Sequence, residues 1–203
     1  MNRRSPAVDL ALIAGFAALI AVCALLPAIN VGAGLVPITL QTFAVLLAGA
    51  VLGMTRGFLA VLLYVVVGVA GAPVFSGGAG GIAVLSGPTA GYLIGFPLAA
   101  GLCGFLVGRL PRTQLASNVP LIFLAGLISS ALLIHTLGMA GLVVRAGLTW
   151  EEAFDVDKIF WIGDAIKNLA MALVATAVHR AFPDLLGRPR RTTEQGLPTH
   201  EPA

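Results

Sequence analysis

The sequence predicts an all-α integral membrane protein built as a single bundle of six transmembrane helices. Of its 203 residues, 58% are hydrophobic and only 10% are charged, whereas a soluble domain of this size has about a quarter of its residues charged. The apolar residues form long continuous runs without the two-residue alternation of barrel strands, which favours helices. A chain of this length has room for five or six spans of about 20 residues each, so one bundle is expected.

Six apolar segments follow one another along the chain and define the predicted spans. The first three end at the helix-breaking residues Pro27, Gly53 and Gly71. The fourth lies between Pro88 and Arg109. The six segments cover residues 8–27, 35–53, 57–72, 90–108, 119–144 and 159–182.

Basic residues are distributed unevenly between the two sides of a six-span topology. Two, Arg145 and Lys158, fall on one side and Lys167 lies within a span, while nine fall on the other side. The nine are Arg3, Arg4, Arg56, Arg109, Arg112, Arg180, Arg188, Arg190 and Arg191. Cytoplasmic loops carry the excess of Lys and Arg, so both termini are predicted to be cytoplasmic. Because the basic residues lie in loops and tails beside the spans, the net charge of +3 reflects membrane topology and does not indicate nucleic-acid binding.

This orientation divides the chain into a membrane domain, residues 1–186, and a tail. The tail, residues 187–203, is polar and contains Pro, so it cannot bury apolar surface and is expected to be a disordered cytoplasmic segment. The outer face would hold three connections, residues 28–36, 74–89 and 145–158.

The sixth segment carries an acid and a base three residues apart, Asp164 and Lys167. Each costs about 2.5–3.5 kcal/mol at the centre of a membrane. Helical geometry places the two side chains about 60° apart on one face, and with Trp161 and Asn168 they form a polar stripe that should face the bundle interior. The pair could merely neutralise itself. We favour a ligand-binding pair, in which Asp164 accepts N–H donors and Lys167 donates, because buried ion pairs rarely add stability over apolar pairs.

A glycine-rich loop precedes the fourth segment. Its glycines let the backbone approach a ligand closely. The residues of this stretch are Gly77, Gly78, Ala79, Gly80 and Gly81. Apolar residues interrupt the loop, so we expect it to pack back into the mouth of the bundle as a lid. These apolar residues are Phe75, Ile82, Val84 and Leu85.

Three further polar residues lie in or beside the apolar segments. Gln41 is inside the second segment, where its amide needs a partner from another helix or from a ligand. Tyr92 begins the fourth segment and is either an interfacial anchor or a ligand contact. His135, in the fifth segment, has no carboxylate nearby in sequence, so we expect a packed or backbone-bonded histidine.

The first segment is rich in alanine. Two pairs with a spacing of four residues occur, Ala14 with Ala18 and Ala17 with Ala21. Small residues at this spacing let another helix come close, either within the bundle or from a partner protein.

The sequence lacks the motifs of the common catalytic and metal centres. It has no HExxH or Walker motif and no Ser/His/Asp or Cys/His arrangement. Cys23 and Cys103 lie within apolar runs, and we expect both to be small buried hydrophobes. Paired carboxylates occur only before the sixth segment, where a solvated face is expected. They are Glu151, Glu152, Asp155 and Asp157. We therefore expect a small-molecule binder or carrier, not an enzyme, with no metal or cofactor bound by this chain.

Several motifs, in sequence order, resemble those of the BioY family. The first is Val36-Pro-Ile-Thr-Leu-Gln-Thr42, followed by the run Ala48–Gly53. The second is the glycine-rich stretch Gly71–Gly81 with Gly87-Pro-Thr-Ala-Gly-Tyr92, and the third is Gly163-Asp-x-x-Lys167. BioY proteins are the biotin-specific substrate-capture (S) components of energy-coupling factor (ECF) transporters.

The resemblance implies a six-helix S component in a prokaryotic plasma membrane, binding biotin from the outside with high affinity. Its partners would be a transmembrane T component and two ATPases, and only the ATPases would use ATP. In S components generally, an Ala-x-x-x-Ala face on the first helix docks the T component, which favours partner docking for Ala14 and Ala18.

The resemblance also assigns ligand binding to Asp164, Lys167, Tyr92 and the 77–81 loop. In that loop, Ala79 lacks the side-chain hydrogen bond that Asn offers in at least one relative. Gln41 joins the expected site, and the rings of Tyr92, Phe75 and Trp161 would cover the apolar body of biotin. Two alternatives are an S component for another vitamin and a stand-alone carrier that uses Asp164 as a proton site.

Overall fold

The apolar segments of the sequence form helices in the computed structural model, which describes residues 5–31 and 36–186. The α-helices within these residues are α1 (Pro6–Leu25), α2 (Gln41–Leu52), α3 (Met54–Val69), α4 (Ala90–Arg109), α5 (Arg112–Leu115), α6 (Val119–Ser129), α7 (Thr136–Ala146) and α8 (Trp150–Ala181). A π-helix, η4 (Ser130–His135), joins α6 to α7, and two 3-10 segments, η2 (Ser76–Gly78) and η3 (Ile82–Ser86), lie between α3 and α4. The predicted tail, 187–203, falls outside the described residues.

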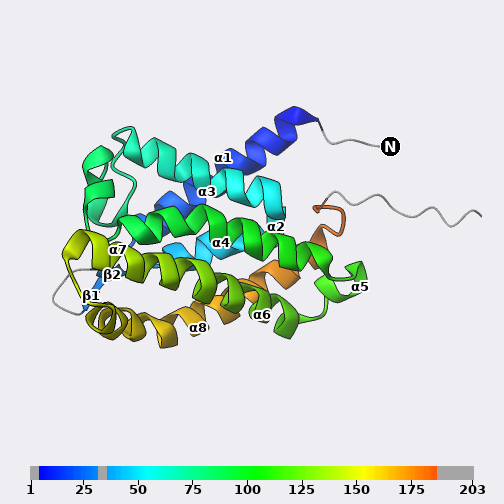
Figure 1. The fold of residues 1–203 in the computed structure, drawn as a ribbon. Helices are drawn as coiled ribbons and strands as arrows, with labels where there is room; N and C mark the ends of the chain where they lie inside the picture. The colour runs from blue at the N-terminus through cyan, green and yellow to red at the C-terminus, as the bar shows by residue number, and fades with distance from the viewer. Residues whose placement is uncertain (1–4, 32–35, 187–203) are drawn as a thin grey trace, which may run out of the picture.

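Helix α4 lies at the centre of the bundle (Figure 1). It packs against α2, α3, α6, α7 and the π-helix. Helix α8 packs against α2, α6 and α7, and α1 packs against α2 and α3. Both ends of the described chain lie at one end of the bundle, and the two short strands lie at the opposite end (Figure 1).

Four helical segments of the described chain are long and apolar enough to cross a membrane. They are Pro6–Leu25, Ala90–Arg109, Val119–Ala146 and Trp150–Ala181. Helices α2 and α3 are apolar but shorter, with 12 and 16 residues, and they meet at Gly53, whose φ of 82° suits glycine. The prediction of a helical multi-pass membrane protein is therefore confirmed, while six complete crossings and cytoplasmic termini stay predictions.

The connection between the first two segments contains a β-hairpin that the sequence does not predict. Strand β1 (Ile29–Val31) pairs antiparallel with β2 (Val36–Ile38). Helix α2 consequently begins at Gln41, and the prediction of a helical segment from residue 35 is wrong. Strands of three residues are too short to show the alternation by which strands are detected.

Helix α8 begins at Trp150, well before the predicted start at residue 159. Thr149 and Glu152 form a capping box, in which the Glu152 amide donates to Thr149 Oγ1 at 3.3 Å and the Thr149 amide donates to Glu152 Oε2 at 2.8 Å. The prediction of a loop over 145–158 is therefore wrong from residue 150 onward. Its carboxylates belong to the first turns of a long helix.

Glycines bring neighbouring helices into close contact. A Cβ atom at Gly141 of α7 would lie 2.7 Å from the amide nitrogen of Gly91 in α4. A Cβ atom at Gly57 of α3 would lie 2.7 Å from Cα of Gly49 in α2. Small residues allow such close approach of helices in a membrane protein, and the first contact holds α4 beside α7, directly after the π-helix.

We predict that Gly141→Ala destabilises the protein by about 1–3 kcal/mol, because the added methyl group meets backbone atoms that cannot rotate away. The measurement is thermal unfolding of the detergent-purified protein. Gly15→Ala on α1 is the control, since a Cβ atom there has nothing within 4 Å. Equal unfolding midpoints for the two variants would contradict the packing argument.

Candidate functional site

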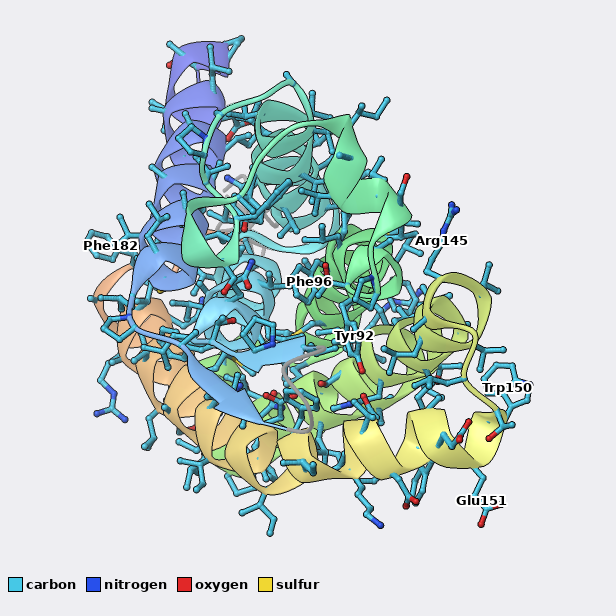
Figure 2. The ribbon with its side chains drawn as sticks, turned by 90° about the vertical axis from the view of Figure 1, so that its left-hand side faces the viewer. Tyr92, Phe96, Arg145, Trp150, Glu151 and Phe182 are labelled. Carbon is cyan, nitrogen blue, oxygen red and sulfur yellow. The ribbon has the colours of Figure 1, made fainter. Side chains whose placement is uncertain are left out.

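A cavity of about 170 Å³ lies between α2, α4, α8, the π-helix and the glycine-rich loop. Its walls are largely apolar, with a polar group at the α8 side. Figure 2 views the molecule from the hairpin end and shows Tyr92 and Phe96 of α4 in the interior, while Trp150, Glu151 and Arg145 lie at the periphery. The lining residues are Val36, Pro37, Thr39, Gln41, Thr42, Phe75, Ser76, Ala79, Val84, Thr89, Tyr92, Leu93, Phe96, Ile134, His135, Phe160, Asp164 and Lys167.

Asp164 and Lys167 both line this cavity and form an ion pair with each other. Asp164 is only 4% exposed, and its Oδ1 also accepts a hydrogen bond from Thr42 Oγ1 at 3.0 Å. The Lys167 ammonium donates to the carbonyl oxygen of Thr39 at 3.0 Å. The prediction that the pair faces the bundle interior is confirmed. The pair also ties α8 to the start of α2 and to the residue that follows the hairpin.

A buried carboxylate and a histidine extend this polar group, and the sequence interpretation missed both. Asp157 is fully buried, so the expectation of a solvated side chain there is wrong. Its carboxylate accepts hydrogen bonds from Tyr92 Oη at 2.8 Å and from Trp161 Nε1 at 2.9 Å. His135 lies between two carboxylates, with Nδ1 2.9 Å from Asp157 Oδ2 and Nε2 3.3 Å from Asp164 Oδ2.

The spacing along α8 could have revealed Asp157. It precedes Asp164 by seven residues, which is about two helical turns and therefore the same face. The assumed helix start at residue 159 hid this relation. By contrast Glu151, Glu152 and Asp155 are exposed as predicted.

Gln41 finds its partner within the protein, while also lining the cavity. Its Nε2 donates to Tyr64 Oη at 2.6 Å, and its Oε1 accepts from Thr39 Oγ1 at 2.9 Å. Tyr64 Oη in turn donates to the carbonyl oxygen of Val74 at 3.2 Å. One hydrogen-bonded chain thus links α2, α3 and the first residues of the glycine-rich loop.

Of the four apolar residues expected to pack the glycine-rich loop back onto the bundle, Phe75 and Val84 pack against the core. Phe75 is 3% exposed and its ring meets Tyr64 edge-on, at 5.4 Å between centroids. The Gly81 amide donates to the carbonyl oxygen of Gly68 at 2.8 Å. Val84 is partly buried against the core, but Ile82 is 74% exposed, so the expectation that it packs inward is wrong.

Only one residue of the 77–81 stretch lines the cavity, Ala79. Gly77, Gly78 and Gly81 have φ values of 70°, 74° and 89°, a region that favours glycine. These glycines therefore shape the turn that presents Ala79, and Gly80 also lies outside the cavity lining.

Trp161 and Asn168 lie beside the cavity and do not line it. Trp161 is 47% exposed, and its ring lies tilted against that of His135, at 5.4 Å between centroids. Asn168 is 1% exposed and faces Gly126 of α6. The prediction of an inward-facing polar stripe is therefore confirmed for Asp164, Lys167 and Asn168 and wrong for Trp161, and of these residues only Asp164 and Lys167 line the cavity.

The alanines of α1 lie on two faces. Ala17 is buried and Ala21 is partly buried against the core, so this pair serves internal packing. Ala14 and Ala18 are exposed. Ala14 and Ala18 therefore lie on an accessible face of α1.

The arrangement is suited to binding a small molecule. No group of three or more His, Cys, Asp or Glu side chains that could hold a metal ion occurs within residues 5–31 and 36–186, and Cys23 and Cys103 are buried as predicted. An apolar cavity closed by a few convergent polar groups is the usual form of a ligand site. Fold and site together define a multi-pass membrane protein that binds a small molecule within its helix bundle.

Comparison with known proteins identifies the family. The family model described as "BioY family" matches residues 1–184, so the chain belongs to the BioY family, as its motifs indicate. The biotin transporter BioY of Rhizobium etli is 40% identical over 182 residues, covering 89% of this chain and 97% of that protein. The biotin transporter BioY of Rhodobacter capsulatus is 41% identical over 190 residues, covering 88% and 96%.

A solved structure has the same fold. The crystal structure of the S-component for biotin from an ECF-type ABC transporter matches with a TM-score of 0.82 and 26% sequence identity. The match covers 89% of this chain and 95% of that chain.

We predict that Tyr64→Phe loosens the glycine-rich loop and lowers the free energy of unfolding by about 1–3 kcal/mol, because the Gln41 amide is left buried without its acceptor. Amide hydrogen exchange followed by mass spectrometry should show faster exchange in residues 74–81. Exchange at the start of α8 is the internal control, since the hydrogen bonds of Tyr64 within the described chain join it to Gln41 and Val74 and not to α8. Unchanged exchange in the loop would contradict this role of Tyr64.

Proposed function

We propose that this chain is the biotin-binding S component of an ECF-type importer, capturing biotin with high affinity from the outer face of the membrane. Membership of the BioY family, relatives named as biotin transporters and the structural match to an S-component for biotin support this function. The observation that carries it is the Asp164–Lys167 pair at the end of an apolar cavity. The chain acts as a binding subunit and performs no chemistry on its ligand.

The chemistry of biotin suits the cavity. Its ureido ring offers two N–H donors and a carbonyl acceptor, its thiophane body is apolar, and its side chain ends in a carboxylate. Asp164 accepts N–H groups and Lys167 donates to a carbonyl or carboxylate oxygen. Tyr92, Phe75 and Phe96 line the apolar part, and Gln41 and Ala79 complete the wall.

The exposed alanine face of α1 supports the proposed partners. In this proposal the T component docks on Ala14 and Ala18, and two ATPases on the T component hydrolyse the ATP that drives import. Gly15, between the two alanines, also has nothing within 4 Å of an added Cβ atom. The orientation proposed for the plasma membrane has six crossings, cytoplasmic termini and the hairpin end outward, where the cavity receives biotin.

Removing either charge of the pair should abolish tight biotin binding. We expect Asp164→Asn and Lys167→Ala each to weaken binding at least about 30-fold, since truncating one partner of a buried charge pair costs about 2 kcal/mol or more. Labelled biotin titrated against detergent-purified protein measures this effect.

Lys158→Ala is the matched control, because Lys158 is exposed and pairs with the exposed Asp155 on the same helix. Riboflavin and thiamine serve as competitors. Displacement of labelled biotin by either vitamin at equal concentration would favour an S component for another ligand. Wild-type affinity in both charge variants would show that the pair does not bind biotin.

Bulk on the exposed alanine face should block assembly without affecting biotin binding. We expect Ala14→Trp to prevent co-purification with the T component and the two ATPases, because a large side chain stops a second helix from approaching closely. Ala170→Trp, at an exposed alanine of α8, is the control and should leave the complex intact. An intact complex with Ala14→Trp would place the docking face elsewhere.

A further inference from the structure

His135 meets a carboxylate on each side of its ring. Nδ1 lies 2.9 Å from Asp157 Oδ2, and Nε2 lies 3.3 Å from Asp164 Oδ2. A neutral imidazole donates from one nitrogen only, whereas an imidazolium donates from both. Two acceptors facing two ring nitrogens are therefore the arrangement of a charged histidine.

The charge balance of the cluster leads to the same assignment. The titratable groups facing His135 are Asp157 and Asp164 of α8 and Tyr92 of α4, whose hydroxyl donates to Asp157. Lys167 adds one positive charge through Asp164. With His135 charged, two negative and two positive groups cancel, whereas a neutral His135 would leave one buried negative charge unpaired at considerable cost.

The groups that contact the Asp164 carboxylate show why the positive charge of His135 matters for ligand binding. A carboxylate oxygen accepts about two hydrogen bonds. Oδ1 already receives Thr42 Oγ1 and the Lys167 ammonium. Among the described residues, Oδ2 has one partner, the ring nitrogen Nε2 of His135 at 3.3 Å. The acceptor position left for a ligand N–H group is therefore on Oδ2, the oxygen that His135 orients.

We propose that His135 is a positioning residue for ligand capture. Its imidazolium holds Oδ2 of Asp164 so that the remaining lone pair of Oδ2 points into the cavity, and Asp157 holds the opposite side of the ring. The inference rests on the proposed function, because it takes Asp164 as the acceptor for the ligand. The ligand group so recognised is an N–H donor.

Biotin affinity tests this role directly. His135→Gln should weaken binding about tenfold or more, since one charge-assisted hydrogen bond is lost. His179→Gln, at a buried histidine that bonds the carbonyl oxygen of Ala50 away from the cavity, should stay within about twofold of wild type. In an Asp164→Asn background, His135→Gln should cause no further loss, because His135 acts through Asp164. Additive losses, or wild-type affinity for His135→Gln, would overturn the proposal.

A second variant covers the case in which His135→Gln does not fold. Asp157→Asn removes the carboxylate on the other side of the His135 ring and should also weaken biotin binding. Combined with Asp164→Asn, it should cause no further loss of affinity. Asp155→Asn, an exposed acid on the same helix, is its control. Wild-type affinity for Asp157→Asn would equally overturn the proposal.

Trp161 provides a readout that needs no ligand. The chain has two tryptophans, so in a Trp150→Phe background the emission comes from Trp161, whose ring lies 5.4 Å from that of His135. A protonated imidazole quenches an adjacent indole, so adding His135→Gln should raise the emission at neutral pH, and adding His179→Gln should not. Unchanged emission would show that His135 carries no charge. If the wild type binds no biotin, the proposed function fails, while the emission still decides the state of His135.

Discussion

Ionisable groups inside an apolar bundle must neutralise one another, and this constraint organises the whole site. The chain Asp157–His135–Asp164–Lys167 satisfies it with alternating charges. Three of the four members also bond to other parts of the fold: Asp157 to Tyr92 of α4, Asp164 to Thr42 of α2, and Lys167 to Thr39 at the end of the hairpin. The interactions that neutralise the charges therefore also hold in place the elements that form the cavity walls.

The parts of this site that the sequence predicts are those that depend on local spacing. Asp164 and Lys167 are one helical turn apart, so their common face follows from helix geometry alone. His135 and Asp157 are distant in sequence and meet only because α7 and α8 fold back against each other. No single-segment pattern contains that information. The seven-residue spacing from Asp157 to Asp164 would have indicated a shared face, provided that the capping box at Thr149 was taken as the start of the helix.

The β-hairpin and the π-helix could not be predicted from the sequence, and the reason is physical. The hairpin strands have three residues each, and the π-helix has six, so neither is long enough to show a periodic pattern. Their positions are decided by packing. Two close contacts with α4 flank His135, the last residue of the π-helix. Before it, a Cβ atom at Gly95 would lie 2.7 Å from the carbonyl oxygen of Leu133; after it, Gly91 meets Gly141. Widened helical turns of this kind occur often at functional sites.

In the glycine-rich loop and in α1, residues of one sequence pattern serve two different structural roles. Four glycines beside Ala79 suggest direct backbone contact with a ligand, yet it is Ala79 that lines the cavity and the glycines that allow the turn. The alanines of α1 divide in the same way, one pair turned into the core and the other exposed. Helix α1 also packs against the 3-10 turn Ser76–Gly78 of that loop. A partner seated on the outer face of α1 would therefore be separated from a wall of the ligand cavity by the thickness of one helix.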